Sequence, residues 1–439
     1  MKLRIFKSEH GDCILLQGDG HNVLCDGGLY KSMRQHVRRP LGDLVEDNGG
    51  VLDAIYVSHL DQDHISGVLQ LLRDAVEWRV YKFHQDNGDT DVNQPKVPKP
   101  PEIKNLWHNS FRDQVGDNAG QIGDLLAAAV PVLRATGVDE FIHEAHEIGN
   151  VAASIREALE VSRYAKPDFL DIPVNFLPGD TGPGKLLFRT DTPQTFSIGS
   201  LNFTLVGPSQ KALDDLRDGW NNWLETSKGE KGVAAVRKKI RDQLDRFASG
   251  QLTGSPFDLR DWNGIKSFRG VTAPNVASLV FMVEEDGKRL LLTGDAQQDK
   301  LLEDLEATRH LEGGHCHLDV LKVAHHGSEH NTDKHFAKIV SADHYVFCGN
   351  GAHGNPEPEV IEIYYKSRLG SASRRALAPE ADGRPFTFWF STNSKDLPFN
   401  SRNRKNFEEV EALVADLVDK SGGMLRAEYV RRDYRTLSV

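Results

Sequence analysis

A chain of 439 residues with 39% hydrophobic and 27% charged residues is a folded globular protein, which excludes a mainly disordered one. Its net charge of −11 argues against a broad basic surface that wraps duplex DNA, because phosphate neutralisation dominates such binding. The sequence has no run of about 18 apolar residues and no signal-peptide pattern, so we expect no membrane association. The four cysteines show no CxxC spacing, and we expect reduced thiols in a cytoplasmic protein.

Strands dominate the start of the chain. They share a short apolar run bounded by glycine or polar residues, and we expect them at 2–8, 12–18, 21–28 and 52–58, with a helical stretch at 31–47. The spacing of VLQLLRD then predicts a helix over 68–74, and 76–85 is expected to be a further strand.

The loop VSHLDQDHISG at 57–67 carries the strongest chemical signal. Four potential metal ligands fall within six positions, and they are His59, Asp61, Asp63 and His64. The loop lies between a buried strand and a helix, so these side chains can converge on one point. Histidine with carboxylate suits a divalent ion such as Zn²⁺ or Mn²⁺, and a metal-activated water is the chemistry that such a site supplies. The alternative is a solvated acidic loop, which the density of ligands disfavours.

The middle of the chain is interpreted as a long insertion, 85–270, of mixed and mainly helical character. Its expected elements are a polar loop at 86–101, helices at 110–164 and 209–248, a strand at 201–207 and a loop at 249–270. Trp220 and Trp223 lie among basic residues, as a nucleic-acid surface would require. Interspersed acidic residues favour a solvated helix with core tryptophans instead. We expect the insertion to border the site as a lid, a substrate surface or a surface for a protein partner.

Strand character returns in the last third. The expected strands are 277–296, 318–328 and 344–351, followed by a helix at 406–420 and a final strand at 427–437. Strands here and near the start end in potential ligands beside glycine, and these are Asp26, Asp295, His325 and His326. Each is weak alone, because an Asp after a strand is usually a turn former. Together they indicate one shared site, since ligands at strand ends are held rigidly.

These motifs resemble those of the metallo-β-lactamase fold family. HLDQDH is similar to its HxHxDH signature, with Asp61 in place of the second His. With DGG early, and LLTGD and LKVAHHGS late, the chain resembles the metallo-β-lactamase-like domain of DNA-uptake competence channel proteins and its soluble relatives. The resemblance implies an α/β fold, an αββα sandwich. Its core would be 1–84 and 271–400, and a C-terminal helix and strand, 401–439, would pack on that core.

The resemblance also implies roles for individual residues. His59 and Asp61 would hold one metal, and Asp63, His64 and His326 a second, with Asp295 bridging the two. The resemblance allows either His325 or His326 to be the metal ligand contributed by the HHG motif. The candidate catalytic residues are Asp63, His325 and His353, the last of which lies in a Gly-rich loop where it could reach a phosphate or simply form a turn.

Two further expectations concern the surroundings of the metals. Asp26 would orient a ligand from behind. The family's third-motif His has no match, because the segment APNVASLVF places Asn275 or Ser278 near that position. With Asp61 also replacing a His, the first metal position is short of nitrogen ligands, which favours Mn²⁺ over tightly bound Zn²⁺.

The function that the resemblance implies is metal-dependent hydrolysis with one or two Zn²⁺ or Mn²⁺ ions. We expect a phosphodiesterase or nuclease that acts on nucleic acid or a nucleotide, in bacterial defence or nucleic-acid handling. One alternative is hydrolysis of a small ester, lactone or amide. Another is a non-catalytic, metal-binding partner protein.

Overall fold

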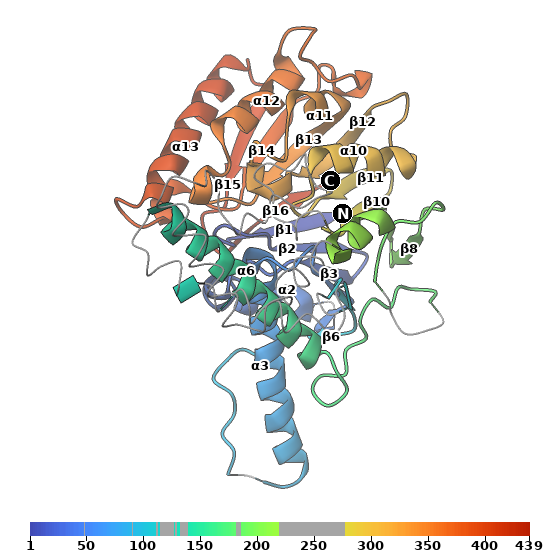
Figure 1. The fold of residues 1–439 in the computed structure, drawn as a ribbon, viewed down its shortest axis with the longest axis vertical. Coiled ribbons are helices and arrows are strands. Elements are labelled where there is room, and N and C mark those ends of the chain that lie inside the picture. The colour runs from blue at the N-terminus through green and yellow to red at the C-terminus, as the bar shows by residue number, and fades with distance from the viewer. Residues whose placement is uncertain are drawn as a thin grey trace, which may run out of the picture.

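The computed structural model describes residues 1–47, 49–89, 91–110, 113–114, 127, 130–131, 139–180, 186–218 and 277–439. Within this part of the chain, two large β-sheets pack face to face, and helices cover the outer face of each (Figure 1). None of the described helices is long and apolar enough to cross a membrane.

The first large sheet has six strands in the order β16-β1-β2-β3-β5-β7. Their bounds are β1 Lys2–Phe6, β2 Ile14–Gly18, β3 His21–Cys25, β5 Ala54–Tyr56, β7 Leu106–Trp107 and β16 Tyr434–Ser438. The helices on this side are α1 Tyr30–Ser32, the π-helical turn η1 Met33–Val37, α2 Arg38–Glu46, α3 Gln62–Asp86 and α6 Asp139–Tyr164. Short strands β4 (Val51–Leu52) and β6 (Glu102–Ile103) pair beside it.

The second large sheet has eight strands in the order β15-β14-β13-β12-β11-β10-β9-β8. Their bounds are β8 Thr195–Ile198, β9 Leu201–Gly207, β10 Val280–Glu285, β11 Lys288–Leu292, β12 Cys316–Lys322, β13 Val340–Phe347, β14 Phe386–Phe390 and β15 Leu425–Tyr429. Its helices are α10 Gln298–Ala307, α11 Lys334–Ile339, α12 Pro358–Leu369 and α13 Arg402–Lys420.

Three apolar cores separate four layers. Because side chains alternate across a strand, Ile14 and Leu16 of β2 join the core between the sheets, whereas Leu15 joins the core under α2, α3 and α6. In the second sheet, Val320 faces the same central core, and Leu318 faces the core under α10 to α13. Strands buried on both faces require nearly continuous apolar sequence, which these strands have. The expected αββα sandwich is therefore confirmed.

The prediction of a strand over 76–85 is wrong, because α3 continues through Asp86. The segment VEWRVYKFHQ alternates well enough for a strand, but β5 pairs directly with β7 and leaves no place between them. The connection between two parallel strands crosses over the sheet, and a helix is its usual form. As a result Val80 and Phe83 are exposed, and the outer half of α3 extends beyond the rest of the molecule (Figure 1).

Two other expectations need revision. Within 85–270, the strands β7, β8 and β9 belong to the two large sheets, so this range is not wholly outside the core. The expected final strand, 427–437, is two strands, because the chain leaves the second sheet after β15 and enters the first as β16. The helices α10, α11 and α12 and the strands β6, β7, β8 and β14 were not predicted. Residues 219–276, with Trp220, Trp223 and Asn275, lie outside the described residues.

Candidate metal centre

Strand ends from both sheets meet at one edge of the sandwich. In the first sheet β3, β5 and β7 are parallel, and in the second β11, β12 and β13 are parallel. The first sheet's strands lead into Asp26, His59 and His108, and the second sheet's lead into Asp295 and His326. A crevice beyond the carboxyl ends of parallel strands is the usual place for a ligand in such folds.

Two glycines allow these ends to approach closely. A Cβ at Gly67 would lie 1.9 Å from the carbonyl oxygen of Gly27, so only glycine lets the start of α3 pack against the end of β3. A Cβ at Gly294 would lie 2.7 Å from that of Ser58, and Gly294 has a φ of +51°. This contact brings the end of β11, and Asp295 with it, against the end of β5.

Asp295 lies at the centre of the cluster that results. Its carboxylate oxygens are 3.8 Å from His59 Nε2, 3.4 Å from His64 Nε2, 3.8 Å from His325 Nε2 and 3.6 Å from His326 Nε2. One carboxylate thus faces four imidazole nitrogens at distances too long for ordinary hydrogen bonds. This spacing is what a shared cation between the groups would require.

Asp12 joins this cluster, although the sequence did not indicate it. Ligand atoms of Asp12, His64, Asp295 and His326 all lie within 4.8 Å of one another, and all four residues are buried. Asp12 Oδ1 is 3.2 Å from His326 Nδ1. Asp12 precedes β2 instead of following a strand, so the strand-end pattern overlooked it. The residues described here include a cluster that could hold a metal ion.

The remaining predicted ligands lie on the same loop. Asp61 Oδ2 is 3.6 Å from His59 Nε2, and the Asp61 side chain makes no capping hydrogen bond to α3. Asp63 Oδ2 is 2.9 Å from His326 Nε2, and Asp63 Oδ1 is 4.0 Å from His64 Nε2. The structure therefore brings all six predicted metal ligands to one edge of the sandwich.

Asp26 and Ser278 hold parts of this arrangement from behind. Asp26 accepts hydrogen bonds from the Ser58 N–H and hydroxyl, both at 2.7 Å, and from His64 Nδ1 at 2.9 Å. Because Nδ1 of His64 donates there, its Nε2 faces Asp295. The Asp295 N–H donates to Ser278 Oγ at 3.4 Å, so Ser278 supports the backbone of Asp295.

His325 and His326 both approach Asp295, but their surroundings differ. His325 Nδ1 donates to Asn331 Oδ1 at 2.7 Å, because the amide nitrogen of Asn331 is used on the carbonyl of Asp295. Burial lowers the pKa of His325, so it is a neutral imidazole with its Nε2 lone pair facing the cluster. Both residues have left-handed backbone, with φ of 47° and 57°. Such strain, about 1–3 kcal/mol a residue, is typical of functional sites.

His353 lies at the rim of the cluster and not inside it. Its side chain is exposed, and its ring packs edge-on against His10 at 6.2 Å between centroids. His10, which the sequence did not indicate, is close enough to Asp63 and His326 for their charges to alter its pKa, which burial lowers overall. The two rings border the cluster on the side of Asp63.

The electrostatics of the cluster favour a bound cation. Burial alone would raise the pKa of Asp295, but His64, His326 and His325 hold it well below its usual value. Conversely, burial would lower the pKa of His326, but Asp295 and hydrogen bonds to Asp12 and Asp63 raise it to about 10. Without metal, protons on the histidines thus offset the buried carboxylates.

The donor set fits divalent ions. Three buried ligand atoms have no hydrogen-bond partner, and they are His59 Nε2, His64 Nε2 and Asp295 Oδ1. An unpaired buried polar atom costs about 1–3 kcal/mol, so three in one cluster indicate a missing partner. Five carboxylates (Asp12, Asp26, Asp61, Asp63 and Asp295) and Lys322 leave four formal negative charges, which two divalent ions would balance.

Lys322 is a fixed cation beneath the cluster. It is 2% exposed, pairs with Asp12 Oδ2, donates to the carbonyl of Gly294 at 2.9 Å and lies 3.7 Å from Asp295 Oδ1. These carboxylates raise the pKa of Lys322 although burial opposes them, so it stays charged. Lys322 lies in the apolar run VLKVA, and the sequence did not indicate a role for it.

His108 is a further residue that the sequence missed. The Asn175 side chain clamps its backbone, accepting from the His108 N–H at 2.7 Å and donating to its carbonyl at 3.0 Å. Both ring nitrogens are buried and have no hydrogen-bond partner. Burial, and then the charge of His59, lower its pKa to about 4, so it is neutral at pH 7. LWHNS repeats the strand-then-His pattern of His59, but a two-residue strand gave too weak a signal.

A His108→Leu substitution should not destabilise the metal-free protein. The imidazole makes no hydrogen bond to lose, so the free energy of unfolding should change by less than about 1 kcal/mol or rise. Urea denaturation in the presence of a chelator measures this change. A loss of several kcal/mol would show that the ring has a partner, and Asn175→Leu is the comparison in which real hydrogen bonds are removed.

Metal binding should release protons near neutral pH. The folded pKa of His326, about 10, exceeds its unfolded value, so its proton stabilises the metal-free protein below about pH 6.5 and this stabilisation is lost as pH rises through 10. A metal must displace that proton, so affinity should rise up to about tenfold per pH unit between pH 7 and 9. Calorimetry in two buffers of different ionisation enthalpy counts the protons. Affinity independent of pH would contradict this expectation.

No protein-family model and no curated protein matches the chain. Among solved structures, it is similar to the metallo-β-lactamase fold protein YhfI from Bacillus subtilis, with 8% identity over 99% of this chain and 98% of that one and a TM-score of 0.32. It is also similar to human tRNase Z, short form, with 11% identity over 100% of this chain and 99% of that one and a TM-score of 0.31. Unliganded yeast PDE1 is similar with 10% identity over 100% of this chain and 99% of that one and a TM-score of 0.37. These overlaps are loose, so the fold assignment depends on the four layers described above.

Proposed function

We propose that this protein is a metal-dependent phosphodiesterase that uses one or two divalent ions at the edge of its sandwich. The observation that carries the proposal is the Asp295 carboxylate, which faces four imidazole nitrogens at 3.4–3.8 Å in a buried, charge-rich cluster. His59 and Asp61 would hold one ion, and Asp63, His64 and His326 the other, with Asp295 between them. Asp12 is within reach of the second position.

Bound divalent ions would supply a Lewis acid and an activated water. The residues of the chain supply orientation and proton handling. Asp26 fixes the ring of His64, and Asn331 fixes the ring of His325. His325 is neutral and faces the cluster, so it can accept or return a proton during hydrolysis. His10 and His353 border the cluster, where they can contact the anionic group of a substrate.

The preference for a phosphodiester follows from the balance of charge and ligand type. Four carboxylates, Asp12, Asp61, Asp63 and Asp295, accompany the four histidines, and sites with this share of oxygen ligands suit harder ions such as Mn²⁺. Such ions and histidine donors stabilise the charge that develops on a phosphoryl group in the transition state. The proposed substrate class is nucleic acid or a nucleotide.

The test is hydrolysis by purified protein loaded with Mn²⁺ or Zn²⁺. The substrates are bis(p-nitrophenyl) phosphate, single-stranded DNA, duplex DNA, RNA and cyclic nucleotides, and Asp63→Ala is the inactive comparison. Cleavage of a phosphodiester that metal restores and Asp63→Ala abolishes supports the proposal. Activity on esters or lactones alone would overturn the substrate class. Folded protein that takes up no metal would overturn the enzymatic assignment.

A further inference from the structure

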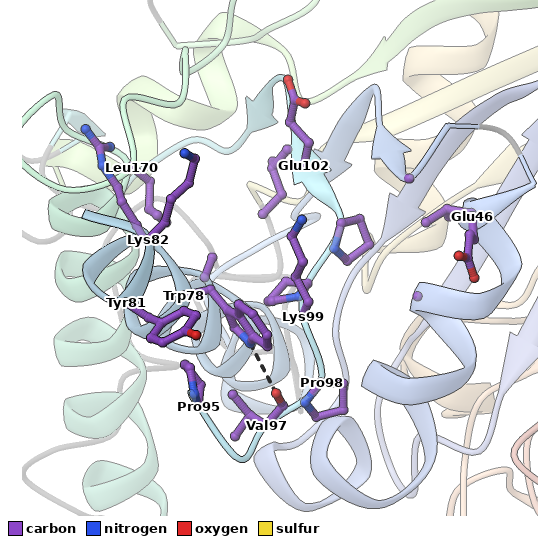
Figure 2. A pocket seen from close by; sticks show the side chains of 18 of the residues that line it. Glu46, Trp78, Tyr81, Lys82, Pro95, Val97, Pro98, Lys99, Glu102 and Leu170 are labelled. Atoms are coloured by element: carbon purple, nitrogen blue, oxygen red, sulfur yellow. Dashed lines mark hydrogen bonds between the residues drawn. The ribbon is translucent and has the colours of Figure 1, made fainter. Parts of the chain in front are cut away.

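A groove of about 1210 Å³ runs along the outer half of α3, away from the metal cluster. Its walls are α2, the part of α3 beyond Ala75, and the proline-rich segment 94–103 that returns beside the helix (Figure 2). The helix α3 joins this groove to the cluster, because Asp63 lies in its first turn. At 1.5 Å per residue, the two regions are roughly 20 Å apart along the helix axis.

Two aromatic side chains form one wall. Trp78 and Tyr81 lie next to each other on α3, with ring centroids 5.9 Å apart, and face Pro95 and Val97 (Figure 2). Trp78 Nε1 donates to the carbonyl of Val97 at 3.1 Å, which fixes the indole and the opposite wall in place. Both rings are only half-buried, so they offer faces to a ligand in a preformed groove.

Unpaired cations line the same groove. The basic lining residues are Arg39, Arg79, Lys82, Lys96 and Lys99, against the acidic residues Asp43, Glu46 and Glu102. Lys82 pairs with Asp86 at 2.7 Å. The other four cations are exposed and form no ion pair with any described residue. Against the three lining carboxylates these four cations leave a small net positive charge, which in a chain of net charge −11 is complementary to an anion.

We propose that the groove binds single-stranded nucleic acid, with phosphates on the unpaired cations and bases against Trp78 and Tyr81. This inference rests on the proposed function, and it names the substrate class and a second binding region. Aromatic faces combined with cations are typical of single-strand binding, because each base offers a face for stacking. A groove of this volume exceeds the about 300–1,000 Å³ of small-ligand pockets, which favours a polymer. A duplex would hide the base faces that Trp78 and Tyr81 require.

The test measures binding and chemistry separately. Full-length protein carrying Asp63→Asn, which prevents cleavage, binds a fluorescein-labelled oligo(dT) 12-mer, followed by anisotropy at several salt concentrations. We expect Arg79→Glu/Lys99→Glu to weaken binding at least tenfold and to reduce its salt dependence. The matched control is Arg426→Glu/Arg431→Glu, which makes the same change at exposed cations outside the groove and should leave binding unchanged. Tyr81→Ala should weaken binding about tenfold through lost stacking.

Two comparisons separate this inference from the proposed function. With Asp63 intact, the groove variant should hydrolyse bis(p-nitrophenyl) phosphate at the normal rate, because that substrate needs only the metal cluster. If binding depends on the groove but no substrate is hydrolysed, the inference about the groove stands and the proposed phosphodiesterase activity is overturned. Binding that the groove variant does not weaken overturns the inference. Binding of a polyglutamate peptide in place of the oligonucleotide would also overturn it, in favour of an acidic protein partner.

Discussion

An Asp295→Asn protein should fold normally but bind metal poorly and lose its hydrolytic activity. The amide keeps the shape of the side chain and removes the negative charge that faces His59, His64, His325 and His326. A central charged ligand contributes to both metal positions, so we expect metal content to fall below half. The rate of phosphodiester hydrolysis should fall by a factor on the order of 10³.

Elemental analysis and steady-state hydrolysis measure these two effects. The matched control is Asp319→Asn on β12, because Asp319 accepts hydrogen bonds from Arg289 and Lys288 at a distance from the cluster. That variant should keep its metal and its activity. Full metal content in Asp295→Asn would contradict the central place given to Asp295.

A Lys322→Met protein should be much less stable than the wild type when metal is removed. Methionine preserves the volume, but Asp12 and Asp295 then lose their buried cation and repel each other. Breaking a buried ion pair from one side costs about 3–5 kcal/mol, because a charge is left uncompensated. Divalent metal should restore a larger part of the stability in this variant than in the wild type, since it replaces the missing positive charge.

Urea denaturation of the wild type and of Lys322→Met, each with a chelator and with Mn²⁺, gives the four free energies of unfolding that are compared. Lys288→Met is the control, because Lys288 is 43% exposed and pairs with Asp319 at 2.9 Å on the neighbouring strand. A surface pair contributes at most about 1 kcal/mol, so that variant should change little. Equal losses in the two variants would show that the buried cation has no special role.

Much of the fold could be predicted because its strands are short, apolar and bounded by glycine. The motifs at strand ends also predicted that His59, His64, Asp295 and His326 would lie at one edge, and the structure places them there. Their assignment as metal ligands stays a prediction, as does the resemblance to competence-channel domains. The pattern of a strand followed by a potential ligand is local, so it identifies only residues that directly follow a strand.

Other parts of the site depend on contacts that local sequence does not encode. Asp12 precedes its strand, and Lys322 lies inside an apolar one, yet the two meet because the sheets pack face to face. The segment 76–85 has strand-like alternation, but the pairing of β5 with β7 makes it helix. Its aromatic and basic residues therefore line a groove instead of a sheet.

Metal-dependent hydrolysis at the cluster is tested most directly by calorimetric metal titration of chelator-treated protein. Hydrolysis of bis(p-nitrophenyl) phosphate is then measured at each metal ratio. We predict saturable binding of one or two divalent ions, proton release on binding, and activity that rises with metal occupancy. His64→Ala, which removes a buried imidazole of the cluster, should lose both signals. Folded protein that binds no divalent ion, or hydrolysis that is unchanged in chelator, would contradict metal-dependent hydrolysis at this cluster.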